Sequence, residues 1–249
     1  MPITKSDPIS NFKNETKKSI RKQALNKDLN KAADTFMLES VKSRYSYNFS
    51  WMGRPIIAYP QDMIAMQELI WEIKPDLIIE TGVAHGGSII YYASLLELIG
   101  KNGLVVGIDI DIRKHNRKEI EKSSVSKRIV LIEGSSLEDK VIKQVEKIVK
   151  KHKTILVCLD SNHTENHVLK ELKIYGKYVS KGSYCVVFDT RIEDLSPDMI
   201  IDRPWSIGNN PKTAVKKFLK NNNSFIIDKK VDHKLLISVA PDGYLKRVK

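Results

Sequence analysis

The sequence has few cysteines and no long hydrophobic run. Only two of its 249 residues are cysteines, Cys158 and Cys185, and both lie inside apolar segments that predict core strands. We therefore expect reduced, packed thiols rather than a disulfide framework. No apolar stretch approaches the roughly 20 residues of a membrane-spanning helix, and residues 1–30 lack the apolar core of a signal peptide. These absences predict a cytoplasmic protein without a transmembrane segment.

Acidic residues are outnumbered by basic ones, 30 against 42, which gives a formal net charge of +12. Such a balance suggests a nucleic-acid-binding or RNA-modifying protein as one alternative. No recognisable RNA-binding motif accompanies the charge. Many of the basic residues fall on predicted helix faces, such as residues 140–153, and charged side chains are common on helix faces exposed to solvent. Attraction to an anionic substrate, glycan or membrane surface stays open. We expect no specific nucleic-acid partner.

The chain predicts one domain with an extension. Residues 1–35 are polar and basic, with eight Lys or Arg against three acids in the first 31, and predict a mobile arm or a loosely docked helix. Residues 36–249 contain enough apolar side chains for one sizeable core. We find no internal repeat and no low-complexity segment.

Apolar strands alternate with amphipathic helices, a pattern that predicts a parallel sheet covered on both faces. The expected strands are Asp76–Glu80, Leu104–Asp109, Ile129–Glu133, Thr154–Asp160, Ser183–Asp189, Phe225–Asp228 and Leu235–Val239. The expected helices are Gln61–Ile73, Ser88–Ile99, Asp139–His152 and His167–Val179. The last two strands are too close in sequence for a helical crossover and should pair antiparallel. A doubly wound, mostly parallel seven-stranded α/β sheet with an antiparallel last strand is the architecture of class I S-adenosylmethionine (SAM)-dependent methyltransferases.

Acidic residues stand where the expected strands end, at the edge where doubly wound sheets bind ligands. Glu80 ends the first strand and is followed by a glycine-rich turn, residues 82–88, into a helix whose first amides suit a carboxylate or phosphate. The spacing is not Gly-x-Gly-x-x-Gly, which argues against a nicotinamide cofactor. Asp109 ends the second strand, where its carboxylate can accept hydrogen bonds from both hydroxyls of a ribose.

Two further strand ends predict a cation site. Asp160 and Asp189 close neighbouring strands about 4.8 Å apart, so they can share one hard cation. His163 follows Asp160 by three residues and either acts as a general base or simply caps a helix or faces solvent.

At this point the chain resembles the cephalosporin hydroxylase and rhamnosyl O-methyltransferase family, from about Tyr45 to the C-terminus. The segments that carry the resemblance are Tyr47-Asn-Phe-Ser-Trp-Met-Gly-Arg-Pro55, Pro60-Gln-Asp62, Pro75-Asp-Leu-Ile-Ile-Glu-Thr-Gly-Val-Ala-His-Gly-Gly-Ser88, Leu159-Asp-Ser-Asn-His163 with His167-Val-Leu169, and Arg203-Pro-Trp-Ser-Ile-Gly-Asn-Asn-Pro211. The resemblance implies a SAM-binding domain, frequent dependence on a divalent metal such as Mg²⁺, and O-methylation of a sugar, glycan or glycosylated natural product. It also fits a homo-oligomer that binds a small-molecule or glycan substrate.

The resemblance assigns roles to the strand-end residues. The cofactor would contact Glu80, Gly82, Gly86, Gly87, Ser88 and Asp109, with Ser135 or Ser136 at the adenine edge. Asp160, Asp189 and Thr190 would hold the cation, Asp160 and His163 would be catalytic, and His163 would accept the proton. Ser135 and Ser136 can equally form a simple loop. The aromatic segment Tyr45–Trp51 and Trp205 either form a substrate lid or seal the edge of the sheet.

Phe188 departs from the family pattern. Members of the family resemble one another in ending the fifth strand with Glu-Asp-Thr, where this chain has Phe188-Asp189-Thr190. A phenyl ring cannot bind a cation. Either Asp160 and Asp189 bind Mg²⁺ weakly, with waters, Thr190 and substrate oxygens completing the shell, or the protein has lost tight metal binding; we favour weak binding. A non-catalytic SAM-fold partner protein is the alternative that this departure raises.

We predict that Phe188→Glu tightens Mg²⁺ binding in the absence of an acceptor, because it restores one negative charge beside a dication. In the wild type, metal affinity should rise when the acceptor is present, since coupling between two ligands is reciprocal. Titration of metal into both proteins, with and without acceptor, measures both effects. Full activity of the wild type in excess chelator would contradict a role for the metal.

Overall fold

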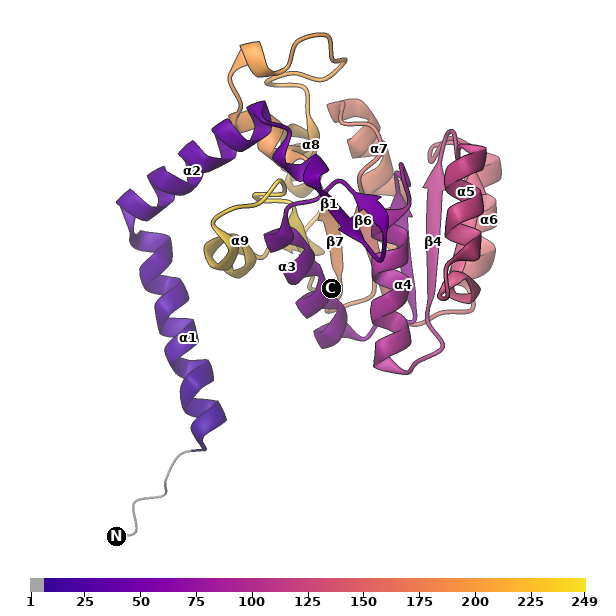
Figure 1. Ribbon diagram of the computed structural model, residues 1–249, viewed down its shortest axis with the longest axis horizontal. Helices are drawn as coiled ribbons and strands as arrows, with labels where there is room; N and C mark the ends of the chain where they lie inside the picture. The colour runs from indigo at the N-terminus through magenta and orange to yellow at the C-terminus, as the bar shows by residue number, and fades with distance from the viewer. Residues whose placement is uncertain (1–6) are drawn as a thin grey trace.

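The computed structural model describes residues 7–249, whose strands form a large sheet and a small hairpin (Figure 1). The large sheet has the order β5-β4-β3-β6-β7-β9-β8, and among its described strands β9 alone runs opposite to the other six. Its strands are β3 (Leu77–Thr81), β4 (Leu104–Asp109), β5 (Ile129–Glu133), β6 (Ile155–Leu159), β7 (Tyr184–Val187), β8 (Phe225–Ile227) and β9 (Tyr244–Arg247). The predicted doubly wound sheet with an antiparallel last strand is confirmed.

Helices cover both faces of this sheet. The helices are α1 (Pro8–Leu25), α2 (Lys27–Lys42), α3 (Pro60–Ile73), α4 (Gly87–Ile99), α5 (Lys114–Lys122), α6 (Asp139–Val149), α7 (Glu165–Tyr175), α8 (Pro211–Lys220) and α9 (Lys229–Leu235). One core lies between the sheet and α3, α4 and α5, and the other between the sheet and α6, α7 and α8. Strands β3 and β6 are buried along their whole length, which explains their unbroken apolar sequences.

Local signals set the ends of helices α3 and α8. Helix α3 begins with Pro60 and ends at Ile73, and Lys74 after it takes a left-handed conformation (φ 50°) before Pro75. The Asn210 side chain caps α8, and the Thr213 hydroxyl accepts from the Asn210 amide in return.

The expected strand Leu235–Val239 is wrong. That segment follows α9, and Leu236 takes a positive φ of 60°, which strand residues avoid. The last strand is Tyr244–Arg247 instead, and it pairs with both β7 and β8. The charged side chains in its C-terminal half give this strand a low hydropathy, so the sequence pattern does not predict it. The apolar run that starts at Leu235 has the hydropathy of a strand but does not form one.

Several elements were not expected from the sequence, among them helix α5 and a short hairpin. Helix α5 is almost entirely charged, and only Asn116 and Ile120 of it are buried. The aromatic segment before α3 contains a short hairpin of β1 (Phe49–Trp51) and β2 (Arg54–Ile56). The hairpin packs on α4, where the Trp51 indole donates a hydrogen bond to the Ser94 hydroxyl at 3.1 Å.

Helix α1 extends away from the body of the protein (Figure 1) and has no buried residue. Its C-terminal end docks through Gln23, whose amide donates to the carbonyls of His233 and Lys234. This docking matches the loosely attached helix that we expected; residues 1–6 of the extension lie outside the described residues. The expected boundary between residues 35 and 36 falls inside α2, and this division of the chain stays a prediction.

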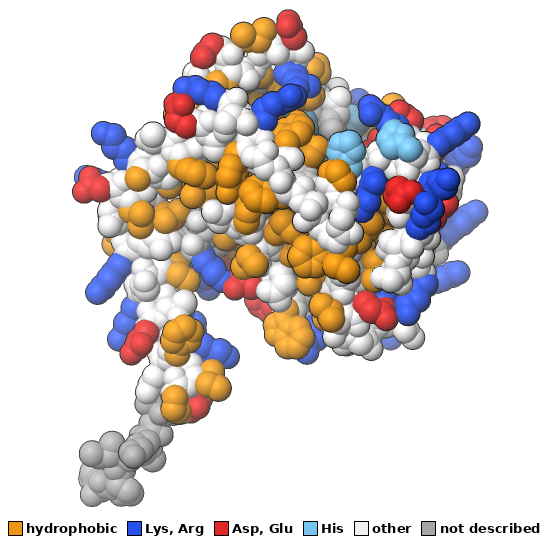
Figure 2. All heavy atoms as spheres, viewed as in Figure 1, with side chains coloured by type: hydrophobic (Ala, Val, Ile, Leu, Met, Phe, Trp, Pro, Cys, Tyr) orange, Lys and Arg blue, Asp and Glu red, His pale blue; other side chains and the backbone are white. Residues whose placement is uncertain are grey.

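Basic side chains are spread over the face shown in Figure 2, along α1 and around the rim, whereas apolar side chains gather in the middle. They form no single basic stripe on that face. Within residues 7–249, no helix combines the length and the apolar content that crossing a bilayer requires. Cys158 and Cys185 are buried and unpaired in β6 and β7, as predicted.

A buried carboxylate joins α3 to the C-terminal part of the chain. Asp62 is 2% exposed, and its carboxylate accepts hydrogen bonds from the hydroxyls of Ser238 (2.6 Å) and Tyr244 (2.8 Å) and from the Val239 amide (2.9 Å). Burial raises the pKa of Asp62 to about 6, although these three donors favour the charged form. The Asp62 contacts explain why residues 238–239 turn inward instead of forming a strand.

We predict that Asp62→Ala lowers the free energy of unfolding by about 3 kcal/mol or more, because it leaves buried donors without an acceptor. Urea denaturation measures the change. Asp34→Ala is a matched control, because Asp34 is exposed and its ion pair with Arg191 should contribute less than about 1 kcal/mol. An equal effect of the two substitutions would contradict this account of Asp62.

Candidate active site

A cavity of about 480 Å³ lies at the carboxyl edge of the sheet, a volume suited to a small organic ligand. Its walls come from the segments that follow the parallel strands, from the hairpin and from α3. The predicted site residues that line it are Glu80, Gly82, Gly87, Ser88, Asp109, Ser135, Ser136, Asp160, His163 and Asp189. Two predicted residues, Gly86 and Thr190, are not among the lining residues.

The glycines of the turn after β3 are required by packing within the chain itself. A Cβ atom at Gly82 (φ 92°) would lie 2.0 Å from the carbonyl oxygen of Asp160, so only glycine allows the two strand ends to approach. A Cβ atom at Gly86 (φ 83°) would lie 2.4 Å from the Ile120 side chain. Gly86 therefore packs against α5 behind the turn, and its expected cofactor contact stays a prediction.

Three side chains hold this turn in place. Asp109 Oδ2 accepts hydrogen bonds from the amides of Val83 (2.8 Å) and Ala84 (3.1 Å). On the opposite side, Asn116 donates to the Ala84 carbonyl, and Arg54 donates to the His85 carbonyl and to Asn116. Asp109 thus orients the turn as well as facing the cavity, and its oxygens retain lone pairs for a ribose.

Arg54 and Asn116 received no role in the sequence interpretation. Arg54 lies within one of the segments that carried the family resemblance, so a signal for it was present. Nothing local distinguished Asn116 in a charged helix.

Glu80 and Ser88 form a pair beneath the turn. The Ser88 hydroxyl donates to Glu80 Oε2 at 2.7 Å, and Glu80 is 1% exposed. Burial raises the pKa of Glu80 to about 8, and the hydroxyls of Ser88 and Tyr92 oppose this only in part.

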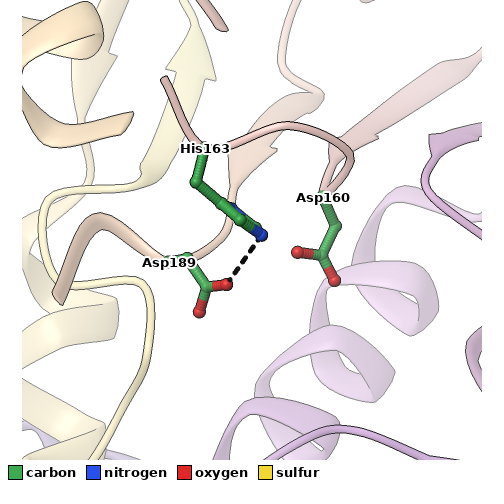
Figure 3. Close-up of side chains that lie close together, drawn as sticks. All are labelled: Asp160, His163 and Asp189. Atoms are coloured by element: carbon green, nitrogen blue, oxygen red, sulfur yellow. Dashed lines mark ion pairs between the residues drawn. The ribbon is translucent and has the colours of Figure 1, made fainter. Parts of the chain in front are cut away.

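Asp160, His163 and Asp189 converge on one point of the cavity (Figure 3). One possible ligand atom from each lies within 4.8 Å of the others, and His163 Nε2 is 3.3 Å from Asp189 Oδ2. Loss of water around Asp160 and the charges of Asp189 and Glu80 hold the Asp160 pKa well above its usual value. Crowded carboxylates of this kind suit a cation.

Phe188 and Thr190 flank this cluster differently. The Phe188 side chain lines the cavity and packs on the core. The Thr190 hydroxyl is buried and donates to the Pro241 carbonyl at 2.6 Å. Thr190 is therefore not a member of the cluster, and His163 supplies the third possible ligand atom in place of the predicted threonine.

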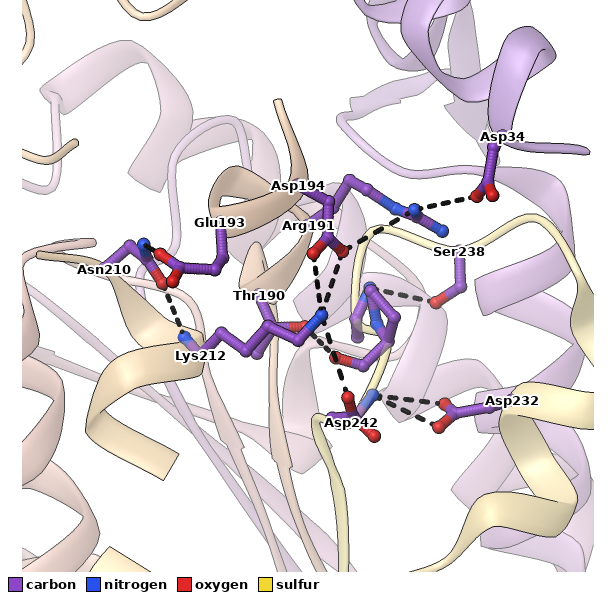
Figure 4. Close-up of polar contacts among 12 residues, drawn as sticks. Asp34, Thr190, Arg191, Glu193, Asp194, Asn210, Lys212, Asp232, Ser238 and Asp242 are labelled. Carbon is purple, nitrogen blue, oxygen red and sulfur yellow. Dashed lines mark hydrogen bonds and ion pairs between the residues drawn. The ribbon is translucent and has the colours of Figure 1, made fainter. Parts of the chain in front are cut away.

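Charged side chains hold the segment that carries Asp189 (Figure 4). Arg191 pairs with Asp34 of α2 at 3.2 Å and with Asp194 at 3.6 Å. Lys212 of α8, 12% exposed, pairs with Asp194 at 2.9 Å and Asp242 at 3.7 Å. The position of Asp189 therefore depends on α2, on α8 and on the turn before β9.

The aromatic side chains that the sequence offered for a substrate lid lie at different places relative to the cavity. The Trp205 ring stands edge-on to His163, with centroids 4.7 Å apart, and Arg203 lies over Trp205. Tyr47 lines the cavity and is 52% exposed, whereas Tyr45 packs against the rings of Phe49 and the buried Tyr59. Trp205 and Tyr47 remain candidates for a substrate lid.

The expected adenine-edge serines have different partners. Ser135 Oγ accepts from the Leu137 amide at 3.3 Å. The Ser136 hydroxyl donates to Glu171 Oε1 at 2.6 Å, a residue that the sequence interpretation did not consider. The loop is therefore held by side chains and is more than a simple turn.

This strand order, the antiparallel seventh strand and a cavity at the carboxyl edge define a class I methyltransferase fold. The chain belongs to the Rhamnosyl O-methyltransferase/CmcI family, whose sequence pattern matches residues 43–248. The family, the fold and the enzyme class expected from the sequence, an O-methyltransferase, are thereby confirmed.

Individual relatives agree with this assignment. A rhamnosyl O-methyltransferase of Mycobacterium tuberculosis (strain H37Rv) is 29% identical over 203 residues, which cover 80% of this chain and 78% of the relative. The corresponding protein of Mycobacterium leprae is 29% identical over 144 residues, 57% of this chain and 61% of that protein.

Solved structures show the same fold. A structure described as cmcI-D160 Mg-SAM superposes with a TM-score of 0.58 and 17% identity over 82% of this chain and 78% of that one. An O-methyltransferase from Bacillus cereus in complex with SAH gives a TM-score of 0.51 and 16% identity, covering 78% of this chain and 81% of that one. At these identities the likeness concerns the fold.

We predict that Glu80 makes the protein less stable as the pH rises. Because its pKa is about 8 in the folded state and 4.5 as a model value, Glu80 keeps its proton longer in the folded state. The free energy of unfolding should then fall between about pH 5 and 8, by up to about 1.4 kcal/mol per pH unit.

Glu80→Gln should reduce the slope by up to about 1.4 kcal/mol per pH unit, which urea denaturation at pH 5.5 and 7.5 measures; the slope that remains comes from Asp62 and Asp160, whose pKa values are also raised. Glu97→Gln is the control, because Arg128 lowers the pKa of Glu97 and leaves it ionised throughout this range. The same slope in wild type and Glu80→Gln would contradict the prediction.

Proposed function

We propose that the protein transfers a methyl group from SAM to a hydroxyl of a sugar or of a glycosylated small molecule, with help from a divalent cation. The observation that carries this proposal is that Asp160, His163 and Asp189 converge on the same cavity that the glycine turn borders. The names of the relatives support a sugar hydroxyl as acceptor, since the mycobacterial proteins are rhamnosyl O-methyltransferases.

The residues at the glycine turn fit SAM by their chemistry. Helix α4 begins at Gly87 on the cavity wall, and its first amides suit the carboxylate of the amino-acid end. Asp109 suits the ribose hydroxyls, and Ser135 and Ser136 suit the adenine edge. The fold relatives with SAM or SAH in their descriptions support this placement.

Asp160 and Asp189 would hold the cation. Their carboxylates offer the hard oxygen ligands that Mg²⁺ prefers, and Mg²⁺ keeps several waters when few carboxylates are available. When bound, SAM supplies an electrophilic methyl group and the cation lowers the pKa of a coordinated hydroxyl.

His163 is the proposed general base. Asp189 lies 3.3 Å from its Nε2 and would stabilise the charged imidazolium after it accepts the proton of the acceptor hydroxyl. Trp205 packs against the ring and restricts its orientation. A cation bound at Nε2 would occupy the same lone pair, so His163 cannot be base and ligand through that atom at once.

Trp205 and Tyr47 would cover the acceptor. Sugars present apolar faces that pack on aromatic rings; Tyr47 lines the cavity, and Trp205 packs against His163, which also lines it. Their job would be to hold the acceptor hydroxyl in line with the methyl group, which is the main requirement of this reaction.

The proposal also covers the location of the protein, its oligomeric state and its domains. The two unpaired cysteines support a cytoplasmic location. Assembly into a homo-oligomer and the division of the chain into residues 1–35 and 36–249 belong to the same proposal.

We predict that His163→Ala lowers turnover about 10²-fold or more and leaves SAM affinity nearly unchanged, because the base acts after the cofactor binds. Transfer of a labelled methyl group from SAM to rhamnosides and other glycosides measures turnover, and calorimetry measures affinity. His115→Ala is a matched control, since His115 is exposed on α5.

Metal titration of His163→Ala separates the two roles of this histidine. A large loss of metal affinity would make His163 a ligand rather than the base. Intact SAM binding without transfer to any hydroxyl by the wild type would favour a non-catalytic partner protein. Salt-dependent RNA binding would favour the nucleic-acid alternative.

A further inference from the structure

A fully buried carboxylate lies behind the cavity and takes no part in the proposed reaction. Glu171 of α7 is 0% exposed, and its Oε1 accepts hydrogen bonds from the hydroxyls of Ser136 (2.6 Å) and Ser161 (2.7 Å). His167, one helical turn earlier, places Nε2 3.3 Å from the same oxygen. Glu171 Oε2 has no hydrogen-bond partner among the described residues. A carboxylate buried in this way costs free energy if it serves packing alone.

The partners of Glu171 reach the cavity from separate elements. Ser136 follows β5, Ser161 follows β6, and His167 belongs to α7, and all three line the cavity whereas Glu171 does not. The Tyr175 hydroxyl donates to the Ser136 carbonyl at 2.6 Å and fixes the loop that carries this serine. Glu171 therefore acts on the cavity only through these three side chains.

The hydrogen bonds to Glu171 determine what Ser136, Ser161 and His167 can offer a ligand. A serine hydroxyl has a single hydrogen, and Ser136 and Ser161 both direct it to Glu171. Only the lone pairs of these oxygens remain for the cavity. His167 Nε2 lies 3.2 Å from Ser136 Oγ and 3.3 Å from Ser161 Oγ, surrounded by acceptors, so it carries its hydrogen toward them. This part of the wall presents hydrogen-bond acceptors.

Under the proposed function, on which this inference rests, the purine of the cofactor lies here. The amino-acid end belongs at α4, after β3, and the ribose at Asp109, after β4, so the base extends toward the serine after β5. Ile110, next to Asp109, lines the cavity and is 75% exposed, which provides apolar surface for a purine ring.

We infer that Glu171 is a positioning residue that makes the site select a 6-amino purine over a 6-oxo purine. By taking the hydrogens of Ser136 and Ser161, it leaves two acceptors that match the N–H donors of a 6-amino group. A 6-oxo group would face them with its own lone pairs, and the site would leave it unpaired.

The test compares the binding of three ligands by calorimetry: S-adenosylhomocysteine, its 6-oxo analogue S-inosylhomocysteine, and the analogue without a substituent at position 6. We expect the wild type to bind the 6-amino ligand at least ten-fold more tightly than the 6-oxo ligand, with the unsubstituted ligand between them.

Variants of the cluster should reduce this preference. In Glu171→Gln the new amide can donate to one serine, which frees that hydroxyl hydrogen for a 6-oxo group, so the ratio of the two affinities should fall several-fold. Ser136→Ala and Ser161→Ala should each weaken binding of the 6-amino ligand about three- to ten-fold and change binding of the 6-oxo ligand less. A change in this ratio is not expected from a loss of packing alone.

Glu146→Gln is the matched control, because Glu146 is a surface residue of α6 that pairs with Lys177 and Tyr178. Thermal melting checks that each variant is folded, and the serine variants carry the test if Glu171→Gln is not. Equal wild-type affinity for the three ligands, or an unchanged ratio in the folded variants, would overturn the inference and leave the proposed function standing. Failure of the wild type to bind S-adenosylhomocysteine would overturn both.

Discussion

Carboxyl groups crowd one edge of the sheet, where little water can screen their charges. Glu80, Asp160 and Asp189 stand at the ends of three adjacent parallel strands, and Asp62 approaches from α3. Burial raises the pKa of Asp62 to about 6 and that of Glu80 to about 8, and Asp160 is raised well above its usual value. Burial, together with the charges of neighbouring carboxylates, destabilises the ionised forms of these groups, and protons, hydroxyl donors or a cation relieve this cost.

The surrounding structure keeps these groups in place against their repulsion. Asp109, Arg54 and Asn116 hold the glycine turn from both sides, and the ion pairs of Arg191 and Lys212 hold the segment after β7. A site in which little reorganises when charge moves suits a reaction that depends on alignment more than on covalent chemistry. The glycine turn, the carboxylate cluster and the serines behind it then serve one cavity.

Apolar patterns in the sequence predict some strands of the sheet correctly and one strand wrongly. Leu104–Asp109 and Ile129–Glu133 are observed with the predicted bounds, because both are apolar runs that end in an acidic residue. Leu104–Asp109 lies inside the sheet and is buried along most of its length, whereas Ile129–Glu133 forms an edge strand. Leu235–Val239 has the same appearance, yet Asp62 draws Ser238 and Val239 inward and Tyr244–Arg247 forms the strand. Propensity is a local property, whereas this choice depends on a partner 176 residues away.

The sequence by itself determined the order of the parallel strands β3 to β7 along the chain, the glycine turn and the acidic residue at the end of each of these strands, because these depend on periodicity and on neighbours in the chain. Only the tertiary structure decided which side chains meet. It turned Thr190 toward Pro241, set His163 beside Asp189, and joined Ser136 and Ser161 to Glu171. A buried polar group binds whichever donor or acceptor the packing brings within reach, and that choice is made only when the layers of the fold come together.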